Sequence, residues 1–592
     1  MKNTLAKNYC AQLDIIKGIA LIAVVLYHLS GDMLPYGYLG VEIFLVISGY
    51  LMMTSILRSL DNGDFSFIKQ IINRVVRLWP LVIAVCAISL AVGYFMMLPD
   101  DFENLSQSVI ASSAFMNNIL AAITTKNYWD IVNVFKPLMH TWYLGVLMQA
   151  YFVVIALVAI CNKVTKGSRS ALRWLMLALT GASLVLFLVP SFDSHEKFYF
   201  LPFRLFEITG GALLALIPRH ASLAQRPRLS LALKILCVAG AVVFMTVKTA
   251  FVPDACKLLF MVVITGVYVY FATLSTGVSP KPLEPLAFLG RNSLSVYLSH
   301  QCVVAFFYYN YVEELTILSF VIFVAIVATL SVALHLMVER PVNRLLRGRG
   351  KNAVLISCIA GAMVLCLLSG LVYLNAGVVR DVPELEVSVD NAQRGMHGAY
   401  CDIPYSWNKD FTDSEKVKVL VIGDSFGRDW ANILNESEIS DKLEISYVYS
   451  GASGYQDVAV RRSKDADFVF CALSSEKDIS DFWLENIPEE KFWVVGHKNF
   501  GKSNGIIYKY RFSEDYHTRT QGLTDSIIAF NNQMKEKYGE HYVDMLSYVI
   551  QGENRVRVFT EDGRYISQDC RHLTRAGAQY YAEKIDLNWL IK

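Results

Sequence analysis

The feature of this sequence that most limits its fold is a series of long apolar stretches in the first part of the chain. A helix needs roughly 20 apolar residues to cross the hydrocarbon core of a bilayer, and these stretches are of that length. Of the 592 residues, 54% are hydrophobic and only 18% are charged, which excludes an ordinary soluble protein. The sequence therefore predicts a multi-span α-helical membrane domain, with spans near 13–30, 38–57, 78–98, 138–161, 171–190, 199–217, 230–250, 257–275, 292–309, 314–338 and 353–376.

The charges between the predicted spans indicate the orientation of the chain. If the N-terminus lies in the cytoplasm, every inner loop carries Lys or Arg, in agreement with the positive-inside rule. An odd number of spans then places the C-terminus outside the cytoplasm. The stretch 105–124 is too polar for a span, and we interpret it as part of a long outer loop. The first span lacks a small-residue cleavage site, so we expect it to be retained. The inner-loop cations are Arg58, Lys69, Arg74, Arg77, Lys163, Lys166, Arg169, Arg173, Arg219, Arg226, Arg228, Lys281, Arg291, Arg340, Arg344, Arg347, Arg349 and Lys351.

The first span carries two ionisable residues, Lys17 and His28. Their spacing is close to three helical turns, so they lie on one face of a helix and about 16 Å apart along it. Ionisable groups inside a membrane are costly, which makes a functional site the first hypothesis. The alternative is a lysine that snorkels to the inner surface and a histidine at the outer interface.

Other ionisable residues recur in or beside the spans. Arg74 and Arg77 are spaced i, i+3 at the inner end of the third span, where two guanidinium groups on one face suit a phosphorylated ligand. Positive-inside anchoring explains this pair equally well. Glu207 lies within an apolar span, and its expected partner is Arg204, with a purely structural ion pair as the alternative to a functional role. Two further candidates, for which an interfacial role is the alternative, are His140 and His300.

Seven segments of the membrane part follow one another in a characteristic order: Lys17–His28, Phe44–Leu51 (FLVISGYL), Arg74–Pro80 (RVVRLWP), His140–Leu144 (HTWYL), Phe203–Glu207 (FRLFE), Ser293–His300 (SLSVYLSH) and Val338–Pro341 (VERP). This order resembles the acyltransferase-3 family of membrane proteins. The resemblance implies a protein that moves acyl groups, commonly acetyl from acetyl-coenzyme A, onto glycans outside the cytoplasm. The chain departs from the family at Lys17, where an arginine is usual, and at Leu147, where the family has a glutamate.

The C-terminal part carries a second pattern. A β-branched run over 416–422 ends in Gly423-Asp424-Ser425, which predicts a strand, a sharp turn and a helix that begins near Ser425. Backbone amides at a helix N-terminus can help to bind an oxyanion. Asp569 stands three residues before His572, so the carboxylate can orient an imidazole that takes the serine proton. Further strands are predicted from Phe468, Phe492 and Tyr542.

These two blocks at the ends of one segment resemble the SGNH (GDSL-like) esterases, which have an α/β fold with a central parallel sheet. The resemblance implies that Ser425, His572 and Asp569 are catalytic. It also implies a glycine in the oxyanion hole, for which Gly451 and Gly454 are the candidates. Gly496-His-Lys-Asn499 matches the family's Gly-x-Asn-Asp block poorly, so no role is assigned to it.

The cysteines indicate no metal site, because no CxxC pattern is present. Eight of them lie in or beside apolar spans, where they act as small hydrophobic residues: Cys10, Cys86, Cys161, Cys237, Cys256, Cys302, Cys358 and Cys366. The other three lie outside the predicted spans and allow one disulfide in three ways. Among these pairings of Cys401, Cys471 and Cys570, we favour Cys401–Cys570.

The two resemblances divide the chain into an acyltransferase-3 domain (1–345) of about ten helices, an additional transmembrane helix (346–376), a periplasmic linker (377–415) and an SGNH-like α/β domain (416–592). They imply an O-acetyltransferase of the bacterial inner membrane. Its donor is cytoplasmic acetyl-coenzyme A, and its acceptor is a cell-surface polysaccharide such as O-antigen or peptidoglycan, which can be lipid-linked. We expect no metal and no nucleic-acid partner.

In this interpretation Arg74 and Arg77 bind the donor phosphates, and His28, helped by Lys17, passes the acyl group outward to Ser425. An alternative is that the membrane domain acylates a lipid-linked glycan directly, and the SGNH-like domain positions or edits it. Two rival functions are a membrane-anchored carbohydrate esterase and an exporter of acylated glycan.

Overall fold

The computed structural model describes residues 11–124, 133–218, 226–248, 252–274, 281–311, 315–347, 350–391, 396–412, 415–473 and 481–592. Cys10 and the predicted inner-loop cations Arg219 and Arg349 lie outside these residues. The chain forms two compact units. The membrane unit comprises Met1–Val92 and Gln107–Ser369, and the C-terminal unit comprises Gly93–Ser106 and Gly370–Lys592.

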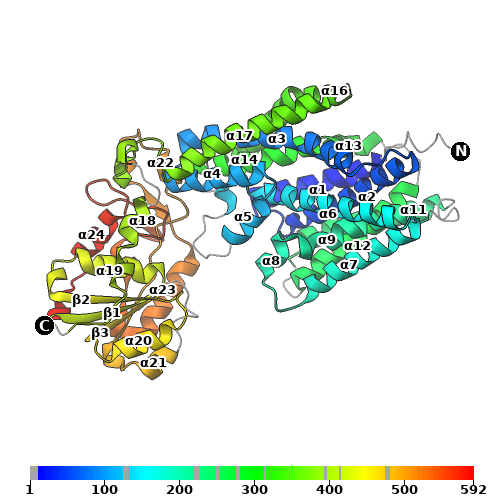
Figure 1. The fold of residues 1–592 in the computed structure, drawn as a ribbon. Coiled ribbons are helices and arrows are strands. Elements are labelled where there is room, and N and C mark those ends of the chain that lie inside the picture. The colour runs from blue at the N-terminus through cyan, green and yellow to red at the C-terminus, as the bar shows by residue number, and fades with distance from the viewer. Residues whose placement is uncertain are drawn as a thin grey trace. The chain divides into compact units, whose positions relative to one another are not determined.

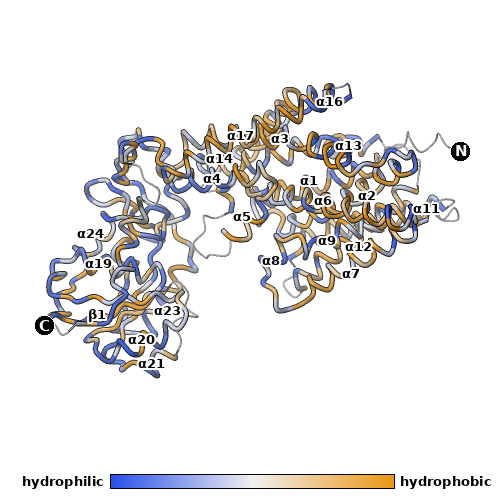
Figure 2. The backbone as a smooth tube through the Cα atoms, viewed as in Figure 1, coloured by the Kyte–Doolittle hydropathy of each residue, from blue (hydrophilic) through white to orange (hydrophobic). Residues whose placement is uncertain are grey.

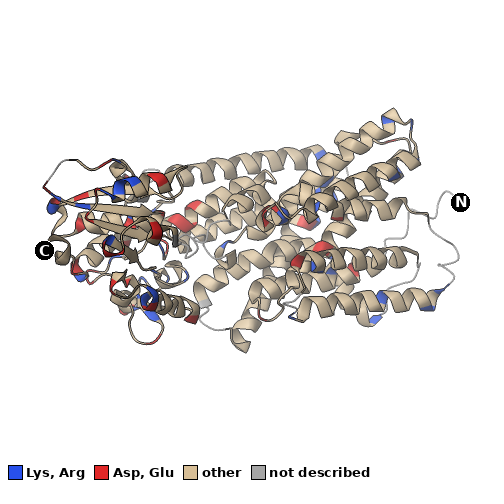
Figure 3. Cartoon of the chain, turned by 90° about the horizontal axis from the view of Figure 1, so that it is seen from below, with Lys and Arg blue, Asp and Glu red and all other residues tan. Residues whose placement is uncertain are grey.

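The membrane unit is built from apolar helices, as predicted. Figure 1 shows these helices side by side, Figure 2 shows their apolar character, and Figure 3 shows that charged residues are sparse along them. Within the described residues, ten helical segments are long and apolar enough to cross a membrane. The described α-helices up to residue 374 are α1 (Ala11–Leu29), α2 (Gly40–Asp61), α3 (Phe67–Met96), α4 (Pro99–Ser113), α5 (Asn117–Thr124), α6 (Trp142–Val164), α7 (Arg169–Leu188), α8 (Ser194–Tyr199), α9 (Leu201–Leu216), α11 (Pro227–Thr246), α12 (Asp254–Leu274), α13 (Glu284–Arg291), α14 (Ser293–Tyr311), α15 (Ile317–Leu334), α16 (Arg340–Arg347) and α17 (Lys351–Leu374).

Of the eleven predicted spans, 292–309 is the one that does not correspond to any of these ten apolar segments. It forms α14, a 19-residue helix rich in polar side chains. These side chains are bonded inside the protein: Ser299 lies 2.7 Å from Ser331, and Gln301 donates to the backbone carbonyl of Lys136 at 3.2 Å. These bonds supply protein partners to polar groups of α14 that would otherwise need water.

The stretch 105–124, which we predicted to be part of an outer loop, is helical and forms the end of α4 and all of α5. Its polar residues are used in packing rather than in solvation. The side-chain amide of Asn117 donates at 2.8 Å both to Leu138 O and to Thr141 Oγ1, and Asn118 pairs with Gln149. The polar side chains that made this stretch unsuitable as a span therefore form hydrogen bonds inside the protein.

Helices α2 and α9 cross closely because of two glycines. A Cβ atom on Gly49 would lie 1.9 Å from Ile208 O, and one on Gly211 would lie 2.0 Å from Val46 O. Small residues allow such an approach of membrane helices. A fully buried arginine, Arg204 on α9, reinforces the contact by donating to both carboxylate oxygens of Glu42 on α2 at 2.8 and 3.0 Å.

The C-terminal unit contains the predicted parallel sheet. Its strands are ordered β2-β1-β3-β4-β6, and the strand after Ser437, β2, is the one that we did not predict. The strands are β1 (Val417–Gly423), β2 (Leu443–Tyr449), β3 (Phe468–Ala472), β4 (Phe492–Val495) and β6 (Tyr542–Val543); β5 (Thr520–Gly522) and β7 (Arg555–Arg557) form a separate antiparallel pair.

Helices cover both faces of this sheet (Figure 1). On one face, a core of β1, β3 and β4 side chains packs against Ala459 of α20, Trp483 of α21 and Met534 of α23. On the other face, Trp430 of α19 packs against Phe470 of β3, with 5.2 Å between the ring centroids and 53° between the ring planes. The chain leaves β1 for β2 on one side and later returns to β3 on the other, so the carboxyl end of β1 is the point where the strand order reverses, which is where α/β sheets commonly bind their ligands. The helices are α19 (Ser425–Glu436), α20 (Tyr455–Ser463), α21 (Asp481–Asn486), α22 (Gly505–Tyr508), α23 (Asp525–Tyr538) and α24 (Arg575–Lys584).

The described part of 377–415, which we expected to be a linker, contacts this α/β fold. Glu384 O accepts a hydrogen bond from the amide of Tyr565 at 2.8 Å. The carboxylate of Asp410 binds both Arg461 and Arg462 at 2.8 Å. The short helix α18 (Met396–Cys401) lies against α19. These residues therefore belong to the C-terminal unit.

Candidate active sites

A sharp turn from β1 into α19 presents the predicted nucleophile. Asp424 caps the helix by accepting a hydrogen bond from the amide of Phe426 at 2.9 Å, which makes Ser425 the first helical residue. A Cβ atom on Gly423 would lie 2.1 Å from Ala472 O, so the turn requires glycine. The first amides of a helix lack intrahelical partners and can stabilise an anion at this end.

His572 links Ser425 to Asp569. Its Nε2 lies 2.9 Å from Ser425 Oγ, and its Nδ1 lies 2.6 Å from Asp569 Oδ2. The other carboxylate oxygen accepts hydrogen bonds from the amides of Arg571 (2.9 Å) and His572 (2.7 Å), which fix the carboxylate. With Nδ1–H donated to Asp569, Nε2 carries the lone pair that can take the serine proton. The structure thus brings the three predicted residues into the arrangement of a catalytic triad.

The pair of His572 and Asp569 shifts both pKa values. Burial favours the neutral form of Asp569, but the charge of His572 and its hydrogen bonds outweigh burial and hold the pKa of Asp569 well below its usual 3.8. Burial also disfavours the charged form of His572, but the Asp569 carboxylate outweighs it and raises the pKa of His572 above 6.5. His572 is therefore a stronger base than a free imidazole.

A buried ion pair that sequence reasoning missed lies beside the triad. Lys498 Nζ is 2.9 Å from Asp429 Oδ2, and the two side chains are only 3% and 2% exposed. The same oxygen accepts a hydrogen bond from the amide of Leu573 at 3.0 Å, and the ammonium lies 3.5 Å from the centroid of the Phe426 ring. The available signal was the spacing of Ser425 and Asp429, one helical turn apart on α19.

Asp100, also missed, acts on the same site from α4. Burial and the carboxylates of Asp569, Asp101 and Glu103 raise the pKa of Asp100 well above 3.8, against the opposing effect of His572. The neighbouring Asp101 accepts a hydrogen bond from Ser503 at 3.5 Å, and both residues belong to the C-terminal unit. No sequence motif indicates that Asp100 interacts with Asp569 and His572, because residue 100 precedes the triad by more than 300 positions.

The predicted oxyanion-hole glycines lie in the turn after β2. The amide of Ser450 donates to Gly423 O at 2.9 Å, which brings this turn beside the carboxyl end of β1. Gly454 has a φ of +73° and precedes α20. The role of Gly451 and Gly454 stays a prediction. Asn499 is used within its own loop, where its Oδ1 accepts a hydrogen bond from the amide of Gly501 at 2.9 Å.

Three histidines that the sequence treated separately meet in the membrane unit. The ring centroids of His28 and His300 are 5.1 Å apart, and those of His140 and His300 are 5.3 Å apart. His140 and His300 are fully buried, whereas His28 is partly exposed. Within the described residues, no group of His, Cys, Asp and Glu side chains is arranged to hold a metal.

Hydrogen bonds indicate which nitrogen of His28 carries the proton. His300 Nδ1 lies 2.5 Å from Tyr297 O and must donate to it, so His300 Nε2 is an acceptor. His28 Nδ1 lies 3.2 Å from that acceptor and 2.9 Å from Val24 O, which requires a proton on Nδ1. His28 Nε2 therefore has the free lone pair of a base or nucleophile.

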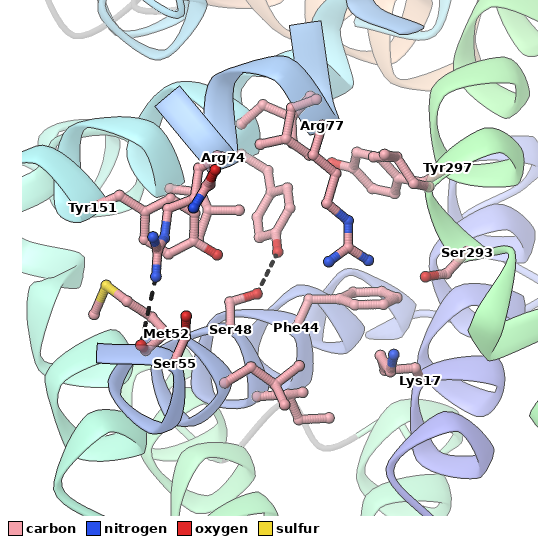
Figure 4. Close-up of a pocket in the computed structure, with 18 residues that line it drawn as sticks. Lys17, Phe44, Ser48, Met52, Ser55, Arg74, Arg77, Tyr151, Ser293 and Tyr297 are labelled. Carbon is pink, nitrogen blue, oxygen red and sulfur yellow. Dashed lines mark hydrogen bonds between the residues drawn. The ribbon is translucent and has the colours of Figure 1, made fainter. Parts of the chain in front are cut away.

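A cavity of about 320 Å³ lies in the same unit (Figure 4). Three cations line it: Lys17, Arg74 and Arg77. Tyr297 also lines it and contacts the histidines, with its ring centroid 5.3 Å from those of His140 and His300. The remaining lining residues are Phe44, Ile47, Ser48, Leu51, Met52, Ser55, Asn73, Leu78, Tyr143, Leu144, Leu147, Tyr151, Ser293 and Leu294.

The three cations of the cavity differ in their partners. Lys17 pairs with the buried Asp14 at 2.8 Å. Arg74 donates to the side chain of Gln70 at 2.8 Å and lies over the ring of Tyr151. Arg77 is exposed and forms no ion pair with any residue that the structure describes. Its guanidinium is therefore available to a bound anion.

Comparison with known proteins decides what the membrane unit is. The acyltransferase-3 family, described as an acyltransferase domain, matches residues 11–336, which is more than half of the chain. The chain belongs to the acyltransferase-3 family. Its membrane part is accordingly a membrane-bound acyltransferase domain.

Curated relatives of this acyltransferase include the peptidoglycan O-acetyltransferase OatA of Listeria monocytogenes, which is 28% identical over 314 residues, half of either protein. A protein of Staphylococcus aureus strain COL that is named as an O-acetyltransferase is 25% identical over 319 residues, 52% of either protein. The chain thus spans about half the length of these relatives. A protein named as the membrane-bound transacylase BcsY of Komagataeibacter xylinus is 28% identical over 377 residues, 61% of this chain and 92% of BcsY. No solved structure matches the chain.

The structure gives the surroundings of two further acyltransferase-3 motif positions, Lys17 and Glu207. Lys17 lines the cavity and His28 does not, in keeping with their expected separation of about 16 Å along the helix. Glu207 pairs with Arg204 at 3.0 Å, as expected, but both side chains are fully buried, and Arg204 also binds Glu42. Glu207 therefore belongs to a buried ion-pair network away from the cavity walls.

Leu147, which departs from the acyltransferase-3 motif, lines the cavity itself. This wall of the cavity is consequently apolar here, and no carboxylate at position 147 can act on a ligand.

The favoured disulfide Cys401–Cys570 is wrong in this structure, because both residues and Cys471 are free cysteines. Each thiol of the favoured pair has another neighbour. Cys401 Sγ lies 3.6 Å from Leu573 O, and Cys570 Sγ lies 3.3 Å from Asn504 Oδ1. Burial is the main cause that raises the pKa of each thiol to about 12, so both stay protonated.

Proposed function

We propose that this protein is an O-acetyltransferase that carries an acetyl group from cytoplasmic acetyl-coenzyme A to hydroxyls of a bacterial cell-surface glycan. The observation that carries the proposal is the hydrogen-bonded triad of Ser425, His572 and Asp569 in a chain whose membrane unit is an acyltransferase domain. The C-terminal unit is proposed to be an SGNH-like domain on the basis of its Gly-Asp-Ser and Asp-x-x-His blocks and its parallel sheet.

The cavity of the membrane unit is the proposed donor site. Arg77 and Arg74 are suited to the phosphates of coenzyme A, since guanidinium groups bind phosphate through paired N–H donors. The cavity is small for a whole coenzyme, so the acyl-bearing arm is the part expected to enter it. Tyr297 lies between the cavity lining and the histidine cluster, which makes His28 Nε2 the proposed group that acts on the acyl carbonyl.

The second stage is proposed at Ser425. His572 Nε2 takes the hydroxyl proton while Ser425 Oγ attacks the acyl carbonyl, and the bond from the carbonyl carbon to the carrier breaks. The protonated His572 then gives its proton to the departing group. A sugar hydroxyl attacks the acyl-serine in the same way, His572 takes the sugar proton, and Ser425 regains it.

The proposed location is the inner membrane, with the N-terminus in the cytoplasm and the C-terminal unit outside. Ten apolar segments alone would return the chain to the cytoplasm. The proposal therefore takes α14 as the eleventh span, which its internally bonded polar residues support.

Three competing functions are distinguishable from this proposal. In the first, the membrane unit alone acylates a lipid-linked glycan, and the C-terminal unit positions or edits that glycan. In the second, the chain is a membrane-anchored carbohydrate esterase. In the third, the chain exports acylated glycan. The triad suits an esterase as well as a transferase, so the donor requirement is what separates them.

The test uses the full-length protein in proteoliposomes with acetyl-coenzyme A on the side of the N-terminus and glycan fragments on the other side. We expect release of free coenzyme A that requires the acceptor, and loss of this release in His28→Ala and in Ser425→Ala. The matched controls are His195→Ala and Ser526→Ala, which make the same changes at exposed positions and should leave the rate unchanged.

Acetylation of the glycan by Ser425→Ala protein at the wild-type rate would show that the membrane unit acts alone. Removal of acetyl groups from the glycan without any need for coenzyme A would identify an esterase.

A further inference from the structure

The loop 509–515 of the C-terminal unit carries an apolar side chain in full contact with solvent. Phe512 is 87% exposed, more than any other large hydrophobic side chain of the described residues. Single exposed apolar residues are common and carry no meaning alone. Phe512 is informative because its loop contacts the end of helix α3.

The loop is fastened to the last turn of α3. Arg511 donates a hydrogen bond to Phe95 O at 3.4 Å, and its guanidinium lies 4.6 Å from the centroid of the Phe512 ring. Arg380 donates to the backbone carbonyls of Tyr94 and Met97 and, at 3.2 Å, to the hydroxyl of Tyr508. All of these residues belong to the C-terminal unit.

This turn is the C-terminal end of a helix that is longer than a bilayer is thick. Helix α3 has 30 residues, about 45 Å of helix, so its ends extend beyond a hydrocarbon core of about 30 Å. The membrane helix α17 ends at the same place, since a Cβ atom on Gly377 would lie 1.9 Å from Pro99 O. Tyr94 and Phe95 are 42% and 66% exposed, as expected of aromatic residues at a membrane interface.

We propose that the loop 509–515 is a membrane anchor of the C-terminal unit, with Phe512 inserted at the boundary between headgroups and acyl chains of the bilayer that α3 spans. The charges fit an anionic lipid surface. Lys509 and Arg511 flank Tyr510 before the tip, whereas Asp515, after the tip, is neutralised by Arg519 at 2.7 Å. An exposed Glu514 follows the tip. Cationic side chains beside an inserted aromatic ring reach lipid phosphates while their stems stay apolar.

The test is a depth measurement on the full-length protein in nanodiscs that contain phosphatidylglycerol. The protein is labelled with 5-fluorotryptophan, and Phe512→Trp adds one fluorine resonance to those of the nine natural tryptophans. We expect a doxyl-labelled lipid to broaden this resonance several-fold, and a water-soluble gadolinium chelate to leave it nearly unchanged.

The matched control is Leu484→Trp on α21, because Leu484 is a 43% exposed side chain and α21 lies at the end of the C-terminal unit opposite α22 (Figure 1). Its resonance should respond to the gadolinium chelate and not to the labelled lipid. The proposal is overturned if Phe512→Trp behaves like this control, or if its resonance is protected from both probes, since protein rather than lipid would then cover the loop.

Discussion

The ammonium of Lys498 and the carboxylate of Asp429 are 2.9 Å apart and almost completely buried. Asp429 lies on α19, which carries Ser425, and its Oδ2 also accepts the amide hydrogen of Leu573, the residue after His572. One carboxylate therefore holds together the two segments that supply the nucleophile and the base. Neither residue is a member of the triad, but the distance between Ser425 and His572 depends on both.

The first prediction concerns this ion pair. Lys498→Met should lower the stability of the C-terminal unit by about 3–5 kcal/mol, because it leaves the buried charge of Asp429 without a partner. Thermal unfolding of the full-length protein in detergent, followed by tryptophan fluorescence, measures the effect. Adding Asp429→Asn should restore part of the loss, whereas purely additive effects of the two changes would contradict a direct coupling.

The second prediction concerns the triad as a unit. Ser425→Ala and His572→Ala should each reduce cleavage of a small acetyl ester by about as much as the double change, roughly 10³-fold or more, because the residues act together. The Asp569→Asn variant should cleave the ester about tenfold to a hundredfold faster than the Ser425→Ala variant, since the base is misoriented but still present. Initial rates of the full-length protein test this, and a double variant far worse than either single one would exclude a shared step.

The third prediction concerns pH. The imidazole of His572 must be neutral to accept the serine proton, so kcat/KM should fall as the pH drops through the pKa of His572, which lies above 6.5. Asp569→Asn removes the carboxylate that raises this pKa, so the acid limb should move to lower pH. Lys498→Met removes a charge that lowers it, so the limb should move to higher pH. Shifts in the same direction for both variants would be inconsistent with the electrostatics of the site.

The fourth prediction concerns the donor site. Arg77→Ala should weaken binding of coenzyme A by about 10- to 100-fold, because a hydrogen bond to a charged group contributes about 1.5–3 kcal/mol. Arg74→Ala should weaken it less, since Arg74 is already bonded to Gln70. Isothermal titration of the detergent-solubilised protein measures both, with the exposed Arg173→Ala as the control. Equal affinity in Arg77→Ala and Arg173→Ala would remove Arg77 from the donor site.

The fifth prediction concerns topology. A reporter enzyme that is active only outside the cytoplasm should work when it is fused after Lys592 and should be silent after Gly350. The physical basis is the odd number of crossings obtained when α14 spans the membrane with its polar groups bonded internally. The opposite pattern would show that α14 does not cross, and it would reverse the direction of acyl transfer.

The features that arise from local patterns could be predicted from the sequence alone. The apolar stretches fixed the membrane helices, because their length and hydropathy leave no other environment for them. The runs before Gly423 and around Phe468, Phe492 and Tyr542 fixed four of the five parallel strands, because β-branched and aromatic residues bounded by turns favour strands. Ser425, Asp569 and His572 were identified from their immediate neighbours along the chain.

Which distant residues meet became apparent from the packing of the folded chain. It brought His28, His140 and His300 together, placed Lys17 in one cavity with Arg74 and Arg77, and paired Lys498 with Asp429. It also left Cys401 and Cys570 unbonded and turned 105–124 into helices. The physical reason is that hydropathy and turn chemistry are local, whereas a buried charge or imidazole is stabilised by whatever partner the packing supplies, and that partner leaves no mark in the sequence around it.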